Sequence, residues 1–124
     1  MNYEDVIEKL EAISIEFESY NDYPKSASNN SKRAIEWKEK NGSDCGTRVG
    51  WTRASQLAGN KNISRDTISR MASFKRHQQH KDVPYSEGCG GLMWDAWGGS
   101  AGVNWASRKL DQLEQLEELK KLLS

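Results

Sequence analysis

Apolar residues near the N-terminus recur at alternating spacings of three and four positions, which is the repeat of an α-helix with a single apolar seam. Charged residues occupy most of the positions between them. The seam consists of Tyr3, Val6, Leu10, Ile13, Phe17 and Tyr20. Comparable helical spacings continue along the chain, and no long alternation of apolar and polar residues predicts a β-strand. The pattern therefore predicts an all-α protein whose first helix covers residues 2–20 and ends before Pro24.

Turn-forming residues divide the remaining chain into further helical segments. Asn41-Gly42, Gly59-Asn60 and Val83-Pro84 are strong helix breakers. Ser64 is expected to cap the helix that follows it, and Gly88-Cys89-Gly90-Gly91 is interpreted as a tight bend rather than a phosphate loop, because no Lys-Ser/Thr pair follows it. We expect helices over residues 28–40, 47–58, 64–80, 92–97 and 100–123. The prediction is a compact bundle of five to six helices with amphipathic, heptad-like terminal helices.

Aromatic side chains should supply much of the core, because the chain is polar for a globular protein. Its 124 residues are 35% hydrophobic and its mean hydropathy is −0.88, and this length suits a single domain. Each of the five tryptophans can bury a large area, and cysteine behaves as a small hydrophobic residue. The predicted core residues are Trp37, Trp51, Trp94, Trp97, Trp105, Cys45 and Cys89.

Charge is distributed unevenly along the chain, although the formal net charge is zero. Residues 1–24 hold one Lys against seven acids, giving −6. Residues 25–81 hold thirteen Lys and Arg against four acids, giving +9, and residues 82–124 hold four against seven, giving −3. A basic middle between acidic ends suggests a segment that faces a polyanion. The alternative is that the acidic ends fold back and neutralise the middle.

The cations of this basic middle are candidates for contact with nucleic acid, because clustered Lys and Arg bind phosphates. Arg65 and Arg76 are eleven residues apart, so they would share one face of a continuous α-helix. The candidate nucleic-acid-binding residues are Lys32, Arg33, Arg48, Arg53, Arg65, Arg70, Lys75 and Arg76.

Cys45, His77, His80 and Cys89 are the residue types that bind zinc. Neither cysteine belongs to a C-x-x-C pair, so the pattern is not specific. The residues favour two reduced, buried cysteines over a metal site, and a Cys45–Cys89 disulfide stays open as a third interpretation. A cysteine nucleophile with His77 as its base lacks an orienting third group, so we assign no catalytic residue, no metal and no cofactor.

The apolar seams of the two ends are candidate surfaces for a protein partner or for self-association. The candidate interface residues are Tyr3, Val6, Leu10, Ile13, Phe17, Leu113, Leu116 and Leu119. We divide the chain into an amphipathic helix at 1–22, a Trp- and Gly-rich basic helical domain at 23–110, and a Leu-rich extension at 111–124. No run of about 20 apolar residues predicts a membrane span, and the acidic N-terminus does not resemble a signal peptide, so a protein that is not secreted is expected.

Residues 23–110 carry many short segments of a known family, in order. The first are Tyr23-Pro24-Lys25, Asn29-Asn30-Ser31-Lys32-Arg33-Ala34, Cys45-Gly46-Thr47, Val49-Gly50, Arg53-Ala54 and Gln56-Leu57-Ala58. The others are Ile63-Ser64, Thr67-Ile68, Arg70-Met71, Ser73-Phe74, Arg76-His77, Gly88-Cys89-Gly90, Trp94-Asp95-Ala96-Trp97-Gly98-Gly99 and Trp105. Together they resemble a small domain of tailed phages and prophages, which is often appended to head-maturation proteases of the prohead-protease type and to other phage head proteins.

The resemblance implies a phage or prophage origin and a place in the host cytoplasm or the virion. It implies no protease activity, because the protease part is absent from these 124 residues. We therefore expect a non-enzymatic virion or head-assembly protein that binds a phage or host protein, or itself, and contacts DNA through residues 32–81. The alternatives are a phage-encoded inhibitor or adaptor that binds a host protein, and a metal-dependent enzyme.

Overall fold

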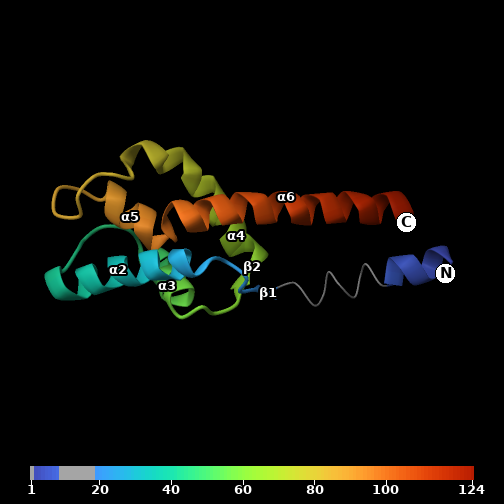
Figure 1. Cartoon of the computed structure of the whole chain (residues 1–124), viewed down its shortest axis with the longest axis horizontal. Helices are drawn as coiled ribbons and strands as arrows, with labels where there is room; N and C mark the ends of the chain where they lie inside the picture. The colour runs from blue at the N-terminus through green and yellow to red at the C-terminus, as the bar shows by residue number, and fades with distance from the viewer. Residues whose placement is uncertain (1, 9–18) are drawn as a thin grey trace.

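The computed structural model describes residues 2–8 and 19–124, and in these ranges the chain is a helical bundle (Figure 1). Residues 3–8 are helical, and the other helices follow the two-residue strand β1. The elements in order are β1 (Ser19–Tyr20), α2 (Lys25–Asn41), α3 (Arg48–Ala58), β2 (Ile63–Ser64), α4 (Arg65–Ser73), the 3-10 helix η1 (Phe74–His80), α5 (Gly90–Ala96) and α6 (Gly99–Leu123). The predicted all-α class is confirmed.

Local capping signals place two of the helix starts. The Thr47 hydroxyl accepts a hydrogen bond from the Gly50 amide at 3.1 Å, and the Ser64 hydroxyl accepts one from the Thr67 amide at 3.2 Å. Each bond satisfies a backbone donor that has no partner inside its helix. The cap expected at Ser64 is therefore confirmed. In α2 the helix begins three residues earlier than expected, directly after Pro24, whose φ of −61° already suits a helix start.

The predicted helix over residues 2–20 is wrong at its C-terminal end, where Ser19–Tyr20 form a strand. This strand pairs antiparallel with β2, with Ser19 opposite Ser64 and Tyr20 opposite Ile63. Tyr20 and Ile63 are 6% and 1% exposed and belong to the same apolar cluster. Burial of these side chains against the rest of the bundle overrides the helical spacing of the segment.

The predicted continuous helix over residues 64–80 is also wrong, because α4 ends at Ser73 and η1 continues as a 3-10 helix. None of the residues of η1 is buried, and Phe74 is its only large apolar residue. Packing therefore gives this segment little support as a full α-helix. The argument that Arg65 and Arg76 share a face assumed 3.6 residues per turn, and it does not apply across this change of period.

The core consists of two apolar clusters, and α2 contributes Ala27 to one and Ala34 to the other. The larger cluster surrounds Trp105, whose ring lies edge-on to Tyr23 at 5.5 Å between centroids. The Tyr23 hydroxyl donates to the carbonyl of Lys61 at 2.7 Å, and burial raises the pKa of Tyr23 to about 12. The second cluster joins α2, α3 and α5 through Ala34, Ala54, Leu92 and Ala96. The three alanines in this cluster let the three helices approach closely.

The tryptophans divide between the core and its margin. Trp94 and Trp105 are buried, as predicted, at 4% and 7% exposure. Trp37, Trp51 and Trp97 are only partly buried and pack against the edges of the two clusters. The largest fully buried side chains are instead mostly aliphatic, among them Leu57, Ile63, Ile68 and Leu92. The core is therefore less dependent on indole rings than the composition suggested.

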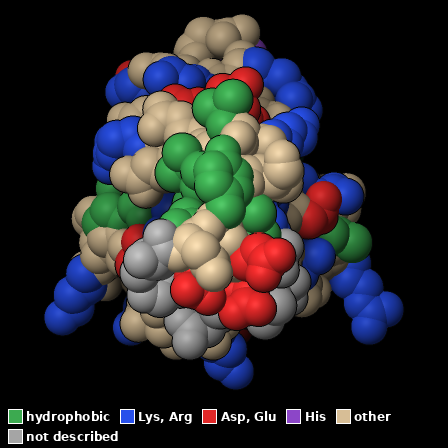
Figure 2. All heavy atoms as spheres, turned by 90° about the vertical axis from the view of Figure 1, so that its right-hand side faces the viewer, with side chains coloured by type: hydrophobic (Ala, Val, Ile, Leu, Met, Phe, Trp, Pro, Cys, Tyr) green, Lys and Arg blue, Asp and Glu red, His purple; other side chains and the backbone are tan. Residues whose placement is uncertain are grey.

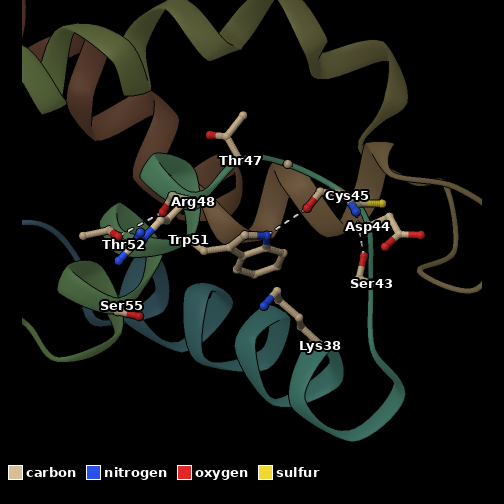
Figure 3. A pocket seen from close by; sticks show the side chains of 10 residues that line it. Lys38, Ser43, Asp44, Cys45, Thr47, Arg48, Trp51, Thr52 and Ser55 are labelled. Carbon is tan, nitrogen blue, oxygen red and sulfur yellow. Dashed lines mark hydrogen bonds between the residues drawn. The ribbon is translucent and has the colours of Figure 1, made fainter.

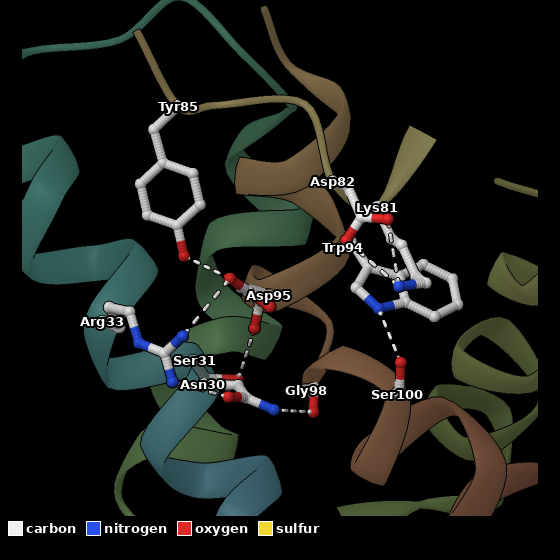
Figure 4. A network of polar contacts seen from close by, with 10 residues as sticks. All are labelled: Asn30, Ser31, Arg33, Lys81, Asp82, Tyr85, Trp94, Asp95, Gly98 and Ser100. Atoms are coloured by element: carbon white, nitrogen blue, oxygen red, sulfur yellow. Dashed lines mark hydrogen bonds and ion pairs between the residues drawn. The ribbon is translucent and has the colours of Figure 1, made fainter. Parts of the chain in front are cut away.

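A polar junction fastens α2 to the turn between α5 and α6 (Figure 4). The Ser31 hydroxyl donates to the carbonyl of Ala96 at 3.0 Å, and the Asn30 amide donates to the carbonyl of Gly98 at 3.0 Å. The Ala96 carbonyl, at the C-terminus of α5, lacks a partner within its helix, and Ser31 satisfies it. The Gly98 carbonyl also accepts from the Gly102 amide at 3.0 Å, so Asn30 adds a second hydrogen bond to it. Gly98 and Gly99 both have positive φ, at 99° and 64°, and a Cβ on Gly99 would lie 2.3 Å from the Asn30 amide nitrogen.

Among the described residues, no helix combines the length and the apolar character that crossing a bilayer requires.

Replacing Gly99 with Ala should destabilise the fold more than a positive φ alone can explain. Gly42 has φ of 74°, and a Cβ added there would meet no atom within 4 Å, so Gly42→Ala measures the backbone cost, about 1–3 kcal/mol. Gly99→Ala should lower the free energy of unfolding by at least about 2 kcal/mol more than Gly42→Ala does, because the methyl group displaces the Asn30 side chain. Chemical denaturation of both variants measures the difference, and equal losses would contradict the close contact.

Candidate functional site

Three of the eight candidate nucleic-acid-binding cations form ion pairs with carboxylates. Arg65 binds Glu117 of α6, Arg70 Nε lies 3.0 Å from Asp66, and Arg33 lies 3.9 Å from Asp95. Glu117 is the largest cause of the raised pKa of Arg65, through their hydrogen bond. The same hydrogen bond lowers the pKa of Glu117. These three arginines are therefore partly neutralised within the chain.

The acidic C-terminal segment reaches the basic middle in part, through the pairs Arg33–Asp95 and Arg65–Glu117. Lys109 of α6 instead joins the two acidic ends, because it lies 2.9 Å from Asp22, and its ammonium is 4.8 Å from the centre of the Tyr20 ring. Arg53 is half-buried and donates to Gln56 at 3.4 Å. The remaining candidates are exposed side chains that lie on α2, α3 and η1: Lys32, Arg48, Lys75 and Arg76. Within the described residues, the eight candidate cations therefore do not form one continuous basic face of unpaired side chains.

The start of α3 borders a shallow pocket of about 430 Å³ (Figure 3). The Trp51 indole nitrogen donates to the carbonyl of Cys45 at 2.8 Å, and the Lys38 ammonium lies 5.1 Å from the centre of the Trp51 ring. This cation–π contact occupies one face of the indole. Trp51 therefore helps to hold the loop between α2 and α3.

Asp95 is the centre of a polar cluster that the sequence did not predict (Figure 4). The Tyr85 hydroxyl donates to its carboxylate, which is 19% exposed, and Arg33 approaches from α2. Burial, and then the hydrogen bond to Asp95, raise the pKa of Tyr85 above its usual range. Trp94, next in sequence, donates from its indole nitrogen to Ser100 at 3.2 Å. Each polar group is matched by another, as in a cluster that stabilises the fold.

The two cysteines form a disulfide, so the preferred interpretation of buried, reduced thiols is wrong. Cys45 and Cys89 are joined across a sequence separation of 44 residues, and Cys89 is exposed. The bridge ties the loop before α3 to the start of α5. Sulfurs bonded to each other cannot act as thiolate ligands, and within the described ranges no three His, Cys, Asp or Glu side chains are placed to hold a metal ion.

The glycine run before α5 is a close contact between two chain segments, in agreement with the predicted bend. A Cβ on Gly90 would lie 2.6 Å from the His80 carbonyl oxygen, and one on Gly91 would lie 2.1 Å from that of Val83. Side chains at these positions would separate α5 from the end of η1. The run therefore serves packing, and it brings His80 next to Gly90.

The C-terminal half of α6 extends beyond α2 to α5, toward the end of the molecule where the N-terminal helix of residues 3–8 also lies (Figure 1). Leu110 and Leu113 still pack against the larger cluster, and Leu116 is half-buried. Leu119 is 47% exposed and Leu122 is 78% exposed. Figure 2 shows hydrophobic side chains gathered in the middle of this end, with acidic side chains close to them and cations toward the edges.

The N-terminal half of the predicted interface is only partly described. Tyr3 is 61% exposed, and Val6 is half-buried. Leu10, Ile13 and Phe17 lie outside the described residues. Leu122 was not among the predicted interface residues, although it continues the three-residue spacing of Leu116 and Leu119 and is the most exposed large hydrophobic residue of the described chain. Following the leucine spacing to its end would have included it.

No protein-family model, curated protein or solved structure matches this chain.

The disulfide should contribute substantially to stability, because it closes a long loop. For a separation of 44 residues the loop-entropy account gives about 4 kcal/mol. We expect the double variant Cys45→Ser/Cys89→Ser to unfold at a clearly lower temperature than the oxidised chain. Dithiothreitol should lower the Tm of the wild type to that of the variant and leave the variant unchanged. A wild type that carries free thiols and yet keeps its Tm would contradict this contribution.

Proposed function

We propose that this chain is a non-enzymatic interaction protein of a tailed phage or prophage, that it works in head assembly or in the virion, and that the C-terminal half of α6 binds its protein partner. The observation that carries the proposal is the exposure of Leu119 and Leu122 beyond the packed part of a 25-residue helix. An apolar stripe at the end of a supported helix is suited to helix-in-groove recognition or to pairing with another helix.

Contacts along α6 support a fixed direction for this stripe. Leu110 and Leu113 pack on the larger cluster, and the ion pair between Arg65 and Glu117 joins the helix to the start of α4. The helix is therefore anchored up to the turn that precedes Leu119. A partner would meet a helix that is already ordered, which reduces the entropy lost on binding.

The resemblance to a domain of phage head proteins supports the biological setting, and the disulfide favours the virion within it. Disulfides persist in oxidising surroundings and are rare in the cytoplasm. A particle released from its host provides such surroundings. The polar cluster around Asp95 supports a non-enzymatic role, since its members are hydrogen-bonded to one another and to backbone carbonyls.

Fewer cations are available for contact with DNA than the sequence alone suggested. Arg33, Arg65 and Arg70 are ion-paired, and Arg53 is half-buried. The contact would depend on the exposed Lys32, Arg48, Lys75 and Arg76. Because these four lie on three different elements, we place protein binding first and contact with DNA second.

Mass spectrometry of purified proheads and mature particles tests the proposal in phage that carry variants of the chain. Wild-type chain should be present at a fixed number of copies per particle. The copy number of the double variant Leu119→Glu/Leu122→Glu should be at least tenfold lower than that of the wild type, because carboxylates on the stripe oppose burial in an interface. Val49→Glu is the matched control, since Val49 is 52% exposed but lies on α3, and its copy number should not change.

Equal amounts of the wild type and the α6 variant in particles would contradict the assignment of the interface. Absence of the wild type from both kinds of particle, together with copurification of one host protein at fixed stoichiometry, would replace the proposal with the inhibitor or adaptor alternative. Circular dichroism of the purified variants shows whether each has kept its helices.

A further inference from the structure

A pocket of about 340 Å³ lies between the start of α3, η1 and α5. It is separate from the stripe on α6, because its lining residues belong to these elements and to the loop before α3. Phe74, Met93 and Trp97 provide its apolar wall, and the Cys89 end of the disulfide borders it. The rings of Phe74 and Trp97 are stacked at 5.8 Å between centroids, which fixes the indole as part of the wall.

The 3-10 conformation of η1 explains why three of its residues face this pocket. A 3-10 helix has three residues per turn, so positions three apart lie on the same face. Phe74, His77 and His80 follow this spacing, and all three line the pocket. In a continuous α-helix the same residues would have rotated away from one another by about 60° per step. The departure from the predicted helix therefore places two imidazoles beside an aromatic wall.

Glycines let the walls of the pocket approach one another closely. A Cβ on Gly46 would lie 2.6 Å from the Met93 sulfur, and Gly46 has φ of 74°. A Cβ on Gly90 would meet the backbone of His80 at 2.6 Å. Gly50 differs, because a Cβ there would make an ordinary contact with the Trp97 ring at 3.8 Å. Larger side chains at Gly50 would therefore extend along the wall and fill the space.

We propose that this pocket binds a small planar aromatic molecule with one hydrogen-bonding group at its edge. Its volume lies in the range of small-molecule sites, which are mostly apolar with a few polar groups that set orientation. An indole, a thioether and a disulfide edge favour an aromatic ring over an aliphatic one of equal size, through ring stacking and sulfur–aromatic contacts. His80 and Nδ1 of His77 supply the hydrogen-bonding groups, since imidazole nitrogens donate or accept, whereas Nε2 of His77 already accepts from Arg76 at 3.3 Å.

Ligand-detected NMR of the full oxidised chain tests the proposal with 2-naphthol as the probe. Its fused rings suit the wall, and its hydroxyl can reach an imidazole. We expect a Kd on the order of 0.1–1 mM, which is typical of a ligand of this size. Decahydro-2-naphthol has the same carbon skeleton and hydroxyl without the aromatic rings, and it should bind at least fivefold more weakly. Equal binding of the two compounds would overturn the aromatic class.

Variants on α3 locate the binding. Gly50→Leu should weaken the binding of 2-naphthol at least tenfold by filling the pocket. Ser55→Leu places the same side chain on the same helix outside the pocket, and it should bind like the wild type. Unchanged binding by Gly50→Leu, or no binding by the wild type, would overturn the proposal. If Gly50→Leu does not fold, nuclear Overhauser contacts between 2-naphthol and the Trp97 ring in the wild type decide it, and their absence overturns the site.

Discussion

The hydrogen bonds from α2 to the turn between α5 and α6 are the constraint on which the rest of the fold depends. Ser31 satisfies the Ala96 carbonyl that the end of α5 leaves without a partner, and Asn30 adds a second hydrogen bond to the Gly98 carbonyl at the start of α6. The chain can turn there because Gly98 and Gly99 adopt positive φ. A Cβ on Gly98 or Gly102 would lie within 3.5 Å of the Ala27 methyl, so α2 also approaches α6 closely beside this turn. One junction therefore sets the positions of three helices.

The functional proposals follow from how this junction directs the two helices that leave it. In one direction, α6 runs past the larger cluster and carries its leucines beyond the bundle, where they become exposed. In the other, α5 leads back to the glycine run and the disulfide, which hold η1 and the start of α3 around the aromatic pocket. The apolar end of α6 is suited to another protein, whereas the pocket is suited to a small molecule. The two surfaces can act independently.

Features that depend on neighbouring residues could be predicted from the sequence, and features that depend on distant ones could not. Local residue spacing and capping chemistry predicted helices α3 and α6 and the cap at Ser64. The strand at Tyr20 depends on Ile63, more than forty residues away in sequence. The disulfide likewise depends on the fold bringing Cys45 to Cys89, and the sequence favoured free thiols because the N-terminus does not resemble a signal peptide that would lead to an oxidising compartment.

In the candidate functional site, too, local features could be predicted from the sequence and long-range contacts could not. The leucine spacing predicted the exposed end of α6, and its extension to Leu122 follows from the same rule. The number of cations, by contrast, could not predict which of them form ion pairs. Arg65 and Glu117, for example, lie close together only because α4 packs against α6. The aromatic pocket depends on a change from α to 3-10 geometry at Phe74, and no single residue type marks that change.

The free energy of unfolding of Asn30→Ala, compared with that of Asn29→Ala, tests the central role of the junction most directly. Asn30 donates to Gly98 and accepts from Arg33, whereas its neighbour Asn29 is exposed on the same helix. We predict a loss of about 1–3 kcal/mol for Asn30→Ala, because the variant removes both the bond to the Gly98 carbonyl and the bond from Arg33. A change within about 0.5 kcal/mol is expected for Asn29→Ala. Equal and small changes in both variants would contradict the account.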